Sequence, residues 1–254
     1  PPGGLALLNA DDENVRWMAT QTRARVVLVG EAADAEVRAS GIGLDWPRGL
    51  LFTVHVGGEQ RLVRTRLLGR QMVFPALAAI AVAHVEGVGL DRAIEAIEEL
   101  EPTPGRMQTI ALANGAVIVR DDFKGTLDAW HAALDAFAAV PARRHLVVLG
   151  DVEEMHGKDD YRDIGRRAGA FADRAFIVGT STNAQLFRSG LAAGGRARDQ
   201  ILHLRHPAEV TELLADELDA GDVVLIRGRW QQALGRIGLA LAGREVRCRA
   251  YPCP

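Results

Sequence analysis

Lysine is the scarcest charged residue of this chain. Only two of its 30 basic residues are lysines, Lys124 and Lys158. Lysine is a compact point charge on a flexible stem and arginine is a rigid planar fork, so they are not interchangeable beside a phosphate. A lysine kept where arginine is otherwise used suggests a chemical role, and Lys124 is the first candidate phosphate ligand. The alternative is that Lys124 is an ordinary exposed surface cation.

Cysteines and aromatic residues are also few. The two cysteines, Cys248 and Cys253, have four residues between them, a spacing that fits neither a metal knuckle nor a disulfide framework. Aromatic residues make up 5% of the 254 residues, and no basic block is interleaved with them. The sequence therefore gives no indication of a nucleic-acid surface. The net charge of -3 and 25% charged residues are typical of a soluble protein with small-molecule or protein partners.

Long apolar runs are missing as well. The runs Leu146–Leu149 and Val223–Ile226 have the length of a strand, far below the roughly 20 residues that cross a bilayer. The first residues, Pro1–Gly4, contain no signal-peptide core. We therefore expect a cytoplasmic protein without a membrane partner. We also expect a monomer.

The second half alternates strand-like and helix-like segments. Apolar runs predict strands at 116–119, 145–149, 175–178, 201–204 and 223–226, and amphipathic stretches predict helices near 128–139, 160–172, 182–193, 207–219 and 231–241. This alternation predicts an α/β fold, a mostly parallel sheet with helices on both faces. Ligands bind such sheets beyond the carboxyl ends of the strands. The candidate binding loops are therefore 121–126, 150–157, 179–182 and 227–230.

The first hundred residues have a different pattern. It predicts strands at 5–8 and 26–29, a helix from about Glu13, and further β structure through 50–67. Two helices should follow, at 73–85 and 91–100, and we expect the first to be buried because it is apolar almost all round. The Pro- and Gly-containing run 101–106 suits a hinge. We place a domain boundary at about 107, between domains 1–107 and 108–254.

Several short motifs occur in order along nearly the whole chain. They are Leu8–Asp12, Ala33–Ala39, Leu68–Arg70 before Ala76–Ala79, Pro104–Arg106, Val119–Asp122, Val148–Asp151 and Val224–Gly228. In this order they resemble the Mur ligases, ATP-dependent amide ligases of peptidoglycan precursor synthesis, and among these the branch that adds D-alanyl-D-alanine to a muramoyl-tripeptide. The resemblance implies that 1–107 is the latter part of a P-loop-type central ATPase domain. It implies that 108–254 is the Rossmann-like C-terminal domain.

A P-loop is not found in this sequence. Lys158 follows Gly157 but precedes Asp159, and no glycine lies five positions before Gly157, so the pattern G-x-x-x-x-G-K-[ST] fails. The resemblance implies ATP and Mg²⁺ as cofactors, with the magnesium ligands in a missing N-terminal part. It also implies that this chain alone does not hydrolyse ATP at a useful rate. A plain dinucleotide-binding domain is disfavoured, because no G-x-G-x-x-G follows a predicted strand.

The run Asp122–Thr126 matches the family's D-x-K-[AG]-T element position by position. The resemblance implies that Asp122 accepts hydrogen bonds from the ribose and that Lys124 and Thr126 lie near the phosphates. It implies that Arg106 contacts the phosphates as the domains close. An ammonium such as that of Lys124 neutralises charge that develops in phosphoryl transfer, so Lys124 is the candidate catalytic residue. The alternatives are that Asp122 caps a helix beginning near Leu127 and that Arg106 is a solvated hinge charge.

Two departures from the family pattern affect the substrate assignment. The branch usually has G-R-H-N-x-x-N-A-L, whose asparagines help to hold the adenine, but this chain has Met72 and Pro75 in their places. The usual K-G-S-R near the end is replaced by Arg227–Trp230. The resemblance implies a nucleotide-sugar peptide and an amino acid or dipeptide as substrates. A ligase for a carboxylate outside the cell wall, or a non-catalytic module that binds a nucleotide or a partner, stays open.

Overall fold

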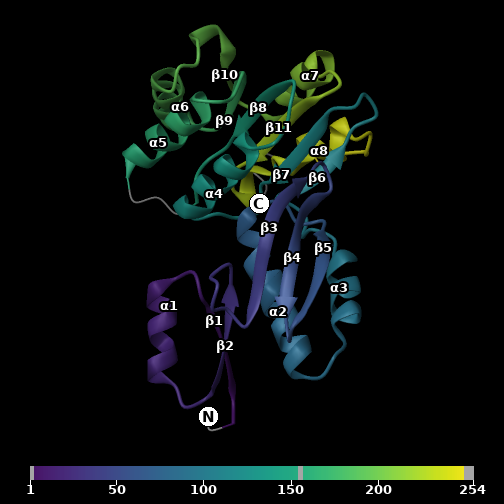
Figure 1. Cartoon of the computed structure of the whole chain (residues 1–254). Helices are drawn as coiled ribbons and strands as arrows, with labels where there is room; N and C mark the ends of the chain where they lie inside the picture. Colours follow the sequence, from purple (N-terminus) through teal and green to yellow (C-terminus); the bar gives the residue numbers. More distant parts are fainter. Residues whose placement is uncertain (1–2, 154–156, 249–254) are drawn as a thin grey trace. The chain divides into compact units, whose positions relative to one another are not determined.

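The chain forms two compact units, Pro1–Glu101 and Pro102–Pro254 (Figure 1). The structure is a computed structural model that describes residues 3–153 and 157–248; Cys253 lies outside these residues. In this described part, no helix is both long and apolar enough to cross a membrane.

The first unit is built on a five-stranded sheet in the order β1-β2-β3-β4-β5. Strands β1, β2 and β3 are parallel, and β4 and β5 continue the sheet antiparallel. The strands are β1 (Leu5–Asn9), β2 (Arg25–Gly30), β3 (Val37–Asp45), β4 (Gly49–Val56) and β5 (Glu59–Thr65), and the helices are α1 (Glu13–Met18), η1 (Ala19–Gln21), η2 (Arg70–Met72), α2 (Val73–Val85) and α3 (Leu90–Glu98). The alternating apolar residues of β4, such as Phe52 and Val54, are buried with Ile80 of α2 and Ile94 of α3.

The sequence predicted helix α2 at its correct position, but the prediction that this helix is buried is correct for one face only. Val73, Leu77 and Ile80 are buried, whereas Val82 is 43% exposed. Only one face of α2 belongs to the core of the first unit. Strand β3 was not predicted, because Gly41 and Gly43 interrupt its apolar alternation and the pairing with β4 shifts register there.

The second unit contains a six-stranded sheet in the order β10-β9-β8-β11-β7-β6. All neighbouring strands are parallel except β6 and β7, so the predicted α/β fold with a mostly parallel sheet is confirmed. The strands are β6 (Gln108–Ala111), β7 (Val117–Asp121), β8 (Arg144–Leu149), β9 (Arg174–Val178), β10 (Ile201–Leu204) and β11 (Asp222–Arg227). The helices are α4 (Leu127–Ala138), α5 (Lys158–Gly169), α6 (Ser181–Ala193), η3 (Arg198–Gln200), α7 (Pro207–Glu217), η4 (Trp230–Gln232) and α8 (Gly235–Leu241).

The helices of the second unit cover opposite faces of its sheet. One apolar cluster joins alternate strand residues, such as Leu146 and Val148, to Val210 of α7 and Ile237 of α8. The intervening strand residues, such as Val147, are equally buried but do not belong to this cluster. They face the other side, where α4, α5 and α6 pack on one another. The chain therefore leaves β8 toward one face, through α5, and leaves β11 toward the other, through α8.

The helix predicted at 231–241 is interrupted. Residues 230–232 form η4, and Ala233 then has a left-handed backbone with φ of 48° before α8 begins at Gly235. A non-glycine residue in this region is uncommon, and it ends one helix and redirects the chain into the next. The apolar periodicity of this stretch gives no sign of such a break.

Candidate functional site

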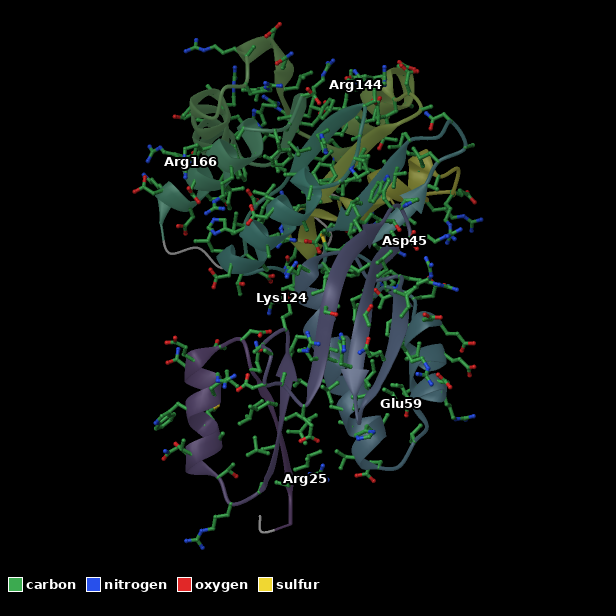
Figure 2. All side chains as sticks on the ribbon, viewed as in Figure 1. Arg25, Asp45, Glu59, Lys124, Arg144 and Arg166 are labelled. Atoms are coloured by element: carbon green, nitrogen blue, oxygen red, sulfur yellow. The ribbon has the colours of Figure 1, made fainter. Side chains whose placement is uncertain are left out.

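The predicted residue Lys124 lies in the loop that joins β7 to α4 (Figure 2). Lys124 is exposed, and so are its predicted partners Arg106 and Thr126. Asp122 is buried at the start of the same loop. The structure therefore brings the four predicted residues into one region of the second unit. The Nη1 of Arg106 is 3.4 Å from the carbonyl oxygen of Lys124, to which it donates a hydrogen bond.

The carboxylate of Asp122 is engaged by Arg120, two residues earlier on β7. Its Oδ1 accepts from Nε of Arg120 at 3.1 Å, and its Oδ2 accepts from Nη2 at 3.3 Å. This bidentate pair fixes the orientation of the carboxylate. A carboxylate has further lone pairs, so Asp122 retains the capacity to accept from a hydroxyl group.

Thr126 is the residue that caps helix α4. Its side-chain oxygen accepts from the backbone N–H of Ala129 at 3.4 Å. The alternative that Asp122 caps this helix is therefore wrong, because Asp122 is paired with Arg120 instead. The first turn of α4 presents backbone N–H groups and the positive end of the helix dipole, an arrangement that favours a phosphate.

Phe123 and Trp230 form an exposed aromatic pair beside Lys124. Their ring centroids are 5.5 Å apart in an edge-to-face arrangement, and the guanidinium of Arg106 lies 5.0 Å from the centroid of Phe123. Phe123 is 38% exposed and Trp230 is 59% exposed. Arg106 therefore makes a cation–π contact as well as its bond to the loop, while its side chain stays exposed.

Arg227 is a buried cation beneath the Lys124 loop, and no role was predicted for it from the sequence. It forms an ion pair with Asp121 of the neighbouring strand and lies 4.7 Å from the centroid of Trp130. Burial, with a smaller contribution from Arg106, lowers the pKa of Arg227 to about 9. A Cβ at Gly125 would lie 2.4 Å from Nη2 of Arg227, so any larger residue there would displace the buried guanidinium.

A second polar cluster lies at the carboxyl ends of β8, β9 and β11. Asp151, just beyond β8, accepts from Nδ2 of Asn183 at 2.7 Å and from Nη2 of Arg229 at 3.3 Å. Gln232 joins the three strand ends: its Oε1 accepts from the N–H of Asp151 at 2.6 Å, and its Nε2 donates to the carbonyl of Val178 at 3.0 Å. The loops after β8, β9 and β11 were predicted as binding loops, but these individual residues were not.

Tyr161 borders this cluster from helix α5. Its hydroxyl oxygen accepts from Asn183 at 3.0 Å and from the N–H of Val152 at 3.3 Å. Burial, followed by the negative charge of Asp151, raises the pKa of Tyr161 to about 12. The hydroxyl is therefore neutral at physiological pH and adds no charge to the cluster.

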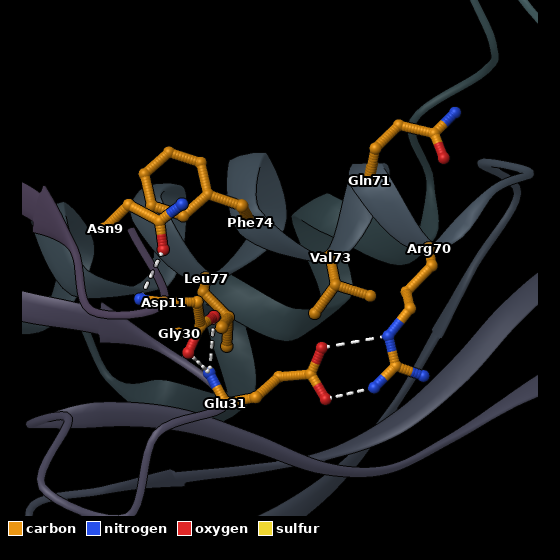
Figure 3. Close-up of a pocket in the computed structure, with 9 residues that line it drawn as sticks. All are labelled: Asn9, Asp11, Gly30, Glu31, Arg70, Gln71, Val73, Phe74 and Leu77. Carbon is orange, nitrogen blue, oxygen red and sulfur yellow. Dashed lines mark hydrogen bonds and ion pairs between the residues drawn. The ribbon is translucent and has the colours of Figure 1, made fainter. Parts of the chain in front are cut away.

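The first unit has its own pocket, with a volume of about 270 Å³ (Figure 3). The start of α2 supplies its apolar side chains, and the remaining lining residues are mostly polar. The lining residues are Asn9, Asp11, Gly30, Glu31, Arg70, Gln71, Val73, Phe74 and Leu77. Asp11 accepts from the N–H groups of Glu31 and Ala32, which holds the loop after β2 against the pocket. A lining that mixes apolar side chains with a few polar groups is typical of small-molecule pockets.

The positions that lost the family asparagines do not line this pocket. Met72 and Pro75 belong to η2 and α2, but neither is among its lining residues. Two amide side chains, those of Asn9 and Gln71, do line it. In the part of the chain that the structure describes, no three His, Cys, Asp or Glu residues are grouped to hold a metal ion.

Comparison with known proteins gives a consistent result. Residues 105–230 match the family described as Mur ligase, glutamate ligase domain. The chain is 31% identical to the UDP-N-acetylmuramoyl-tripeptide–D-alanyl-D-alanine ligases of Mycobacterium bovis and Mycobacterium tuberculosis, over 97% of its length and 52% of theirs. It is 33% identical, over 74% of its length and 39% of the relative, to the UDP-N-acetylmuramoyl-L-alanyl-D-glutamate–2,6-diaminopimelate ligase of an Acidovorax species. The chain thus spans about half the length of the tripeptide ligases that it matches.

Solved structures show the same fold. MurF from Acinetobacter baumannii superposes with a TM-score of 0.81 at 19% identity, over 96% of this chain and 53% of that one. MurF from Thermotoga maritima in complex with ADP superposes with a TM-score of 0.75 at 17% identity, over 95% and 53%. Both units described above therefore have counterparts in these structures.

Proposed function

The chain belongs to the Mur ligase family, and on that premise we propose that the whole protein is an ATP-dependent ligase that joins an amine to the carboxylate of a UDP-muramoyl-peptide. The amine is an amino acid or a dipeptide, with D-alanyl-D-alanine as the leading candidate because the tripeptide–D-alanyl-D-alanine ligases match nearly the whole chain. The reaction belongs to peptidoglycan precursor synthesis in the cytoplasm.

The observation that carries the proposal is the Asp122–Thr126 loop. It has a lysine, rare in this chain, two residues before the N-cap of a 12-residue helix, and the guanidinium of Arg106 donates to the backbone carbonyl of this lysine. Two cations and a helix N-terminus favour a polyanion such as a nucleotide phosphate. Asp122 adds an oriented carboxylate that suits the hydroxyls of a ribose.

The pocket of the first unit has the apolar side chains of Phe74 and Leu77 and the amide of Asn9 in its lining, and it is by itself a candidate site for an aromatic ring.

In the Mur reaction, the γ-phosphoryl group of ATP passes to the substrate carboxylate, and the amine then attacks the acyl phosphate with loss of phosphate. Such a reaction depends on positioning and charge neutralisation and needs no nucleophilic side chain. Lys124 would neutralise charge on the transferred phosphoryl group, and Arg106 would hold the phosphates. The magnesium ligands would come from the part of the whole protein outside this chain.

The test is a ligation assay on the whole protein, encoded in frame with this chain. UDP-muramoyl-tripeptide, D-alanyl-D-alanine, ATP and Mg²⁺ are supplied, and ADP release and the pentapeptide product are measured together. We expect ADP release only when both substrates are present. A protein that binds ADP but forms no product with any muramoyl-peptide and amine would instead be a non-catalytic nucleotide-binding module.

A further inference from the structure

Arg227, the last residue of β11, lies beneath the Lys124 loop, which is formed by residues 122–126. Its register partner on β7 is Asp121, the residue that leads into this loop. The Arg227 side chain is 2% exposed, so a ligand at the surface of the loop does not reach it. Any role of Arg227 in function must therefore act through the residues that it contacts.

One series of contacts runs from Arg227 to Arg106. Arg227 forms an ion pair with Oδ2 of Asp121, and Oδ1 of the same carboxylate accepts from the backbone N–H of Met107 at 3.1 Å. Met107 is buried and has a left-handed backbone with φ of 47°, a conformation that a non-glycine residue keeps only where its surroundings fix it. The Arg227–Asp121 pair therefore helps to fix the backbone beside Arg106.

A second series of contacts runs from Arg227 to the residues that follow Lys124. Nη2 of Arg227 lies directly against Gly125, where a Cβ would collide with it. The guanidinium also lies 4.7 Å from the ring centroid of Trp130, which is 1% exposed and donates its backbone N–H to the carbonyl of Thr126 at 3.0 Å. Arg227 therefore supports Gly125 directly and Thr126 through Trp130.

Stability alone does not account for an arginine at position 227. Two of its donors, Nε and Nη2, are buried and have no acceptor among the described residues. An unpaired buried donor costs free energy, and a buried ion pair is often no more stabilising than apolar side chains of the same volume. What the guanidinium supplies is a planar fork that contacts a carboxylate, an aromatic ring and a glycine at the same time.

We propose that Arg227 is a positioning residue for the nucleotide phosphates, which holds Arg106 and Lys124 where both side chains reach them. This proposal rests on the proposed ligase function and adds a residue to it. Misplacing a group that holds the substrate by about 1 Å can lower the rate about 100-fold. A buried residue that supports two such groups therefore affects the reaction without touching the substrate.

The first test is amide hydrogen exchange of the chain, followed by NMR, in the original protein and in Arg227→Met. Methionine keeps much of the volume and removes the guanidinium. We expect the N–H groups of Met107 and Phe123 to exchange at least tenfold faster in the variant. In the original protein, the first donates to Asp121 and the second to the carbonyl of Gly105. Unchanged protection of both amides overturns the proposal.

Arg174→Met is the matched control. Arg174 also pairs with a carboxylate, that of Glu217 at 3.0 Å, and lies 5.5 Å from the ring centroid of Phe176. Its Nε is likewise buried without an acceptor in the described part of the chain. Arg174 begins β9, however, whereas Arg227 ends β11, and the strands between them are parallel. The control should leave both amides unchanged, and equal acceleration by the two variants overturns the proposal.

The second test is ligation by the whole protein. Arg227→Met should raise KM for ATP at least fivefold and leave KM for D-alanyl-D-alanine unchanged. A smaller folded fraction lowers the rate but changes no KM, so this difference separates positioning from stability. If Arg227→Met does not fold, Arg227→Lys is used, which keeps a charge for Asp121 and should give a smaller rise. An unchanged KM for ATP in the variant that folds overturns the proposal.

The two tests keep this proposal separate from the ligase function. Product formation with an unchanged KM for ATP in the variant refutes the role of Arg227 and leaves the ligase function standing. If the original whole protein forms no product, the ligase function fails, and an ADP titration of the same protein decides the role of Arg227. ADP should then bind at least fivefold more weakly to the variant, and equal affinity refutes the role.

Discussion

At the scale of single residues, Lys124 carries the strongest functional expectation. Lys124→Ala should lower the rate of ligation by the whole protein about 100- to 1,000-fold, the usual loss when one group that stabilises the transition state is removed. The matched control is Lys158→Ala, which removes the only other lysine, an exposed residue at the start of α5, and should change the rate less than twofold. Steady-state kinetics check both; equal effects of the two substitutions would contradict the role of Lys124.

Asp222 gives a pH-dependent expectation for stability. Its carboxylate is fully buried and accepts from both Arg143 and Arg144. Burial acts to raise the pKa of Asp222, but the hydrogen bonds from the two arginines outweigh it and hold the pKa at about 2. Because the pKa is lower in the folded protein, the stabilisation is fully present above the unfolded value of about 4 and is lost as the pH falls toward 2.

We therefore expect Asp222→Asn to lower the free energy of unfolding at pH 7 by roughly 1 to 2 kcal/mol, allowing for solvent screening of the arginines. The difference in the free energy of unfolding between the variant and the original protein should become smaller as the pH falls from 4 to 2. Urea unfolding across this range measures it. A difference that stays constant with pH would mean that the ionised carboxylate is not the stabilising species.

At the scale of elements, Thr126 has two separable roles. As the N-cap of α4 it contributes about 1 kcal/mol, so Thr126→Ala should destabilise the second unit by roughly that amount. Asn caps a helix as well as Thr does, so Thr126→Asn should keep the stability. Thr126→Ser should keep the stability and the hydroxyl.

These substitutions also test the phosphate role. If Thr126 contacts the phosphates through its hydroxyl, the Asn variant should lose ligation activity and the Ser variant should retain it, although both fold normally. Thermal unfolding and the ligation assay are compared for the three variants. Full activity of the Asn variant would mean that Thr126 acts only as a helix cap and that its hydroxyl has no role in ligation.

Most helices and strands of the second unit were predictable because each is specified by an apolar pattern within its own segment. Strand β11 and helix α7 have apolar patterns of the right period and length, and the structure places them within two residues of their predicted ends. Apolar patterns do not predict a helix end that is set by one backbone angle. Ala233, which breaks the helix predicted at 231–241, is an example. Strand β6 was also not predicted, since its four residues alternate too briefly to be recognised.

The candidate site was predictable to a similar extent. The Lys124 loop follows one strand, so neighbouring residues in the sequence define it. The Asp151–Arg229 pair joins loops 78 positions apart, and the Gln232 bonds depend on three strand ends that meet only in the folded sheet. No local pattern encodes such a contact, and only the strand order reveals it.

At the scale of the whole molecule, each unit has its own apolar core. Phe52 is fully buried in the first core and Phe176 in the second. We expect Phe52→Ala to destabilise the first unit by about 3 to 5 kcal/mol, with a comparable effect of Phe176→Ala on the second. Hydrogen exchange should show faster exchange in β4 and β5 for the first variant, and in β8 and β9 for the second. Uniform loss of protection across both sheets would contradict separate cores.

The position of β11 in the sheet also has a consequence for synthesis on the ribosome. The strand that lies between β8 and β7 is the last of the six to be made, after more than 70 residues have followed β8. Until it emerges, β7 and β8 both have an unpaired edge, and exposed edges invite pairing with other chains. The nascent second unit therefore depends on β11 to pair the facing edges of β7 and β8. The risk of aggregation is greatest just before that strand is complete.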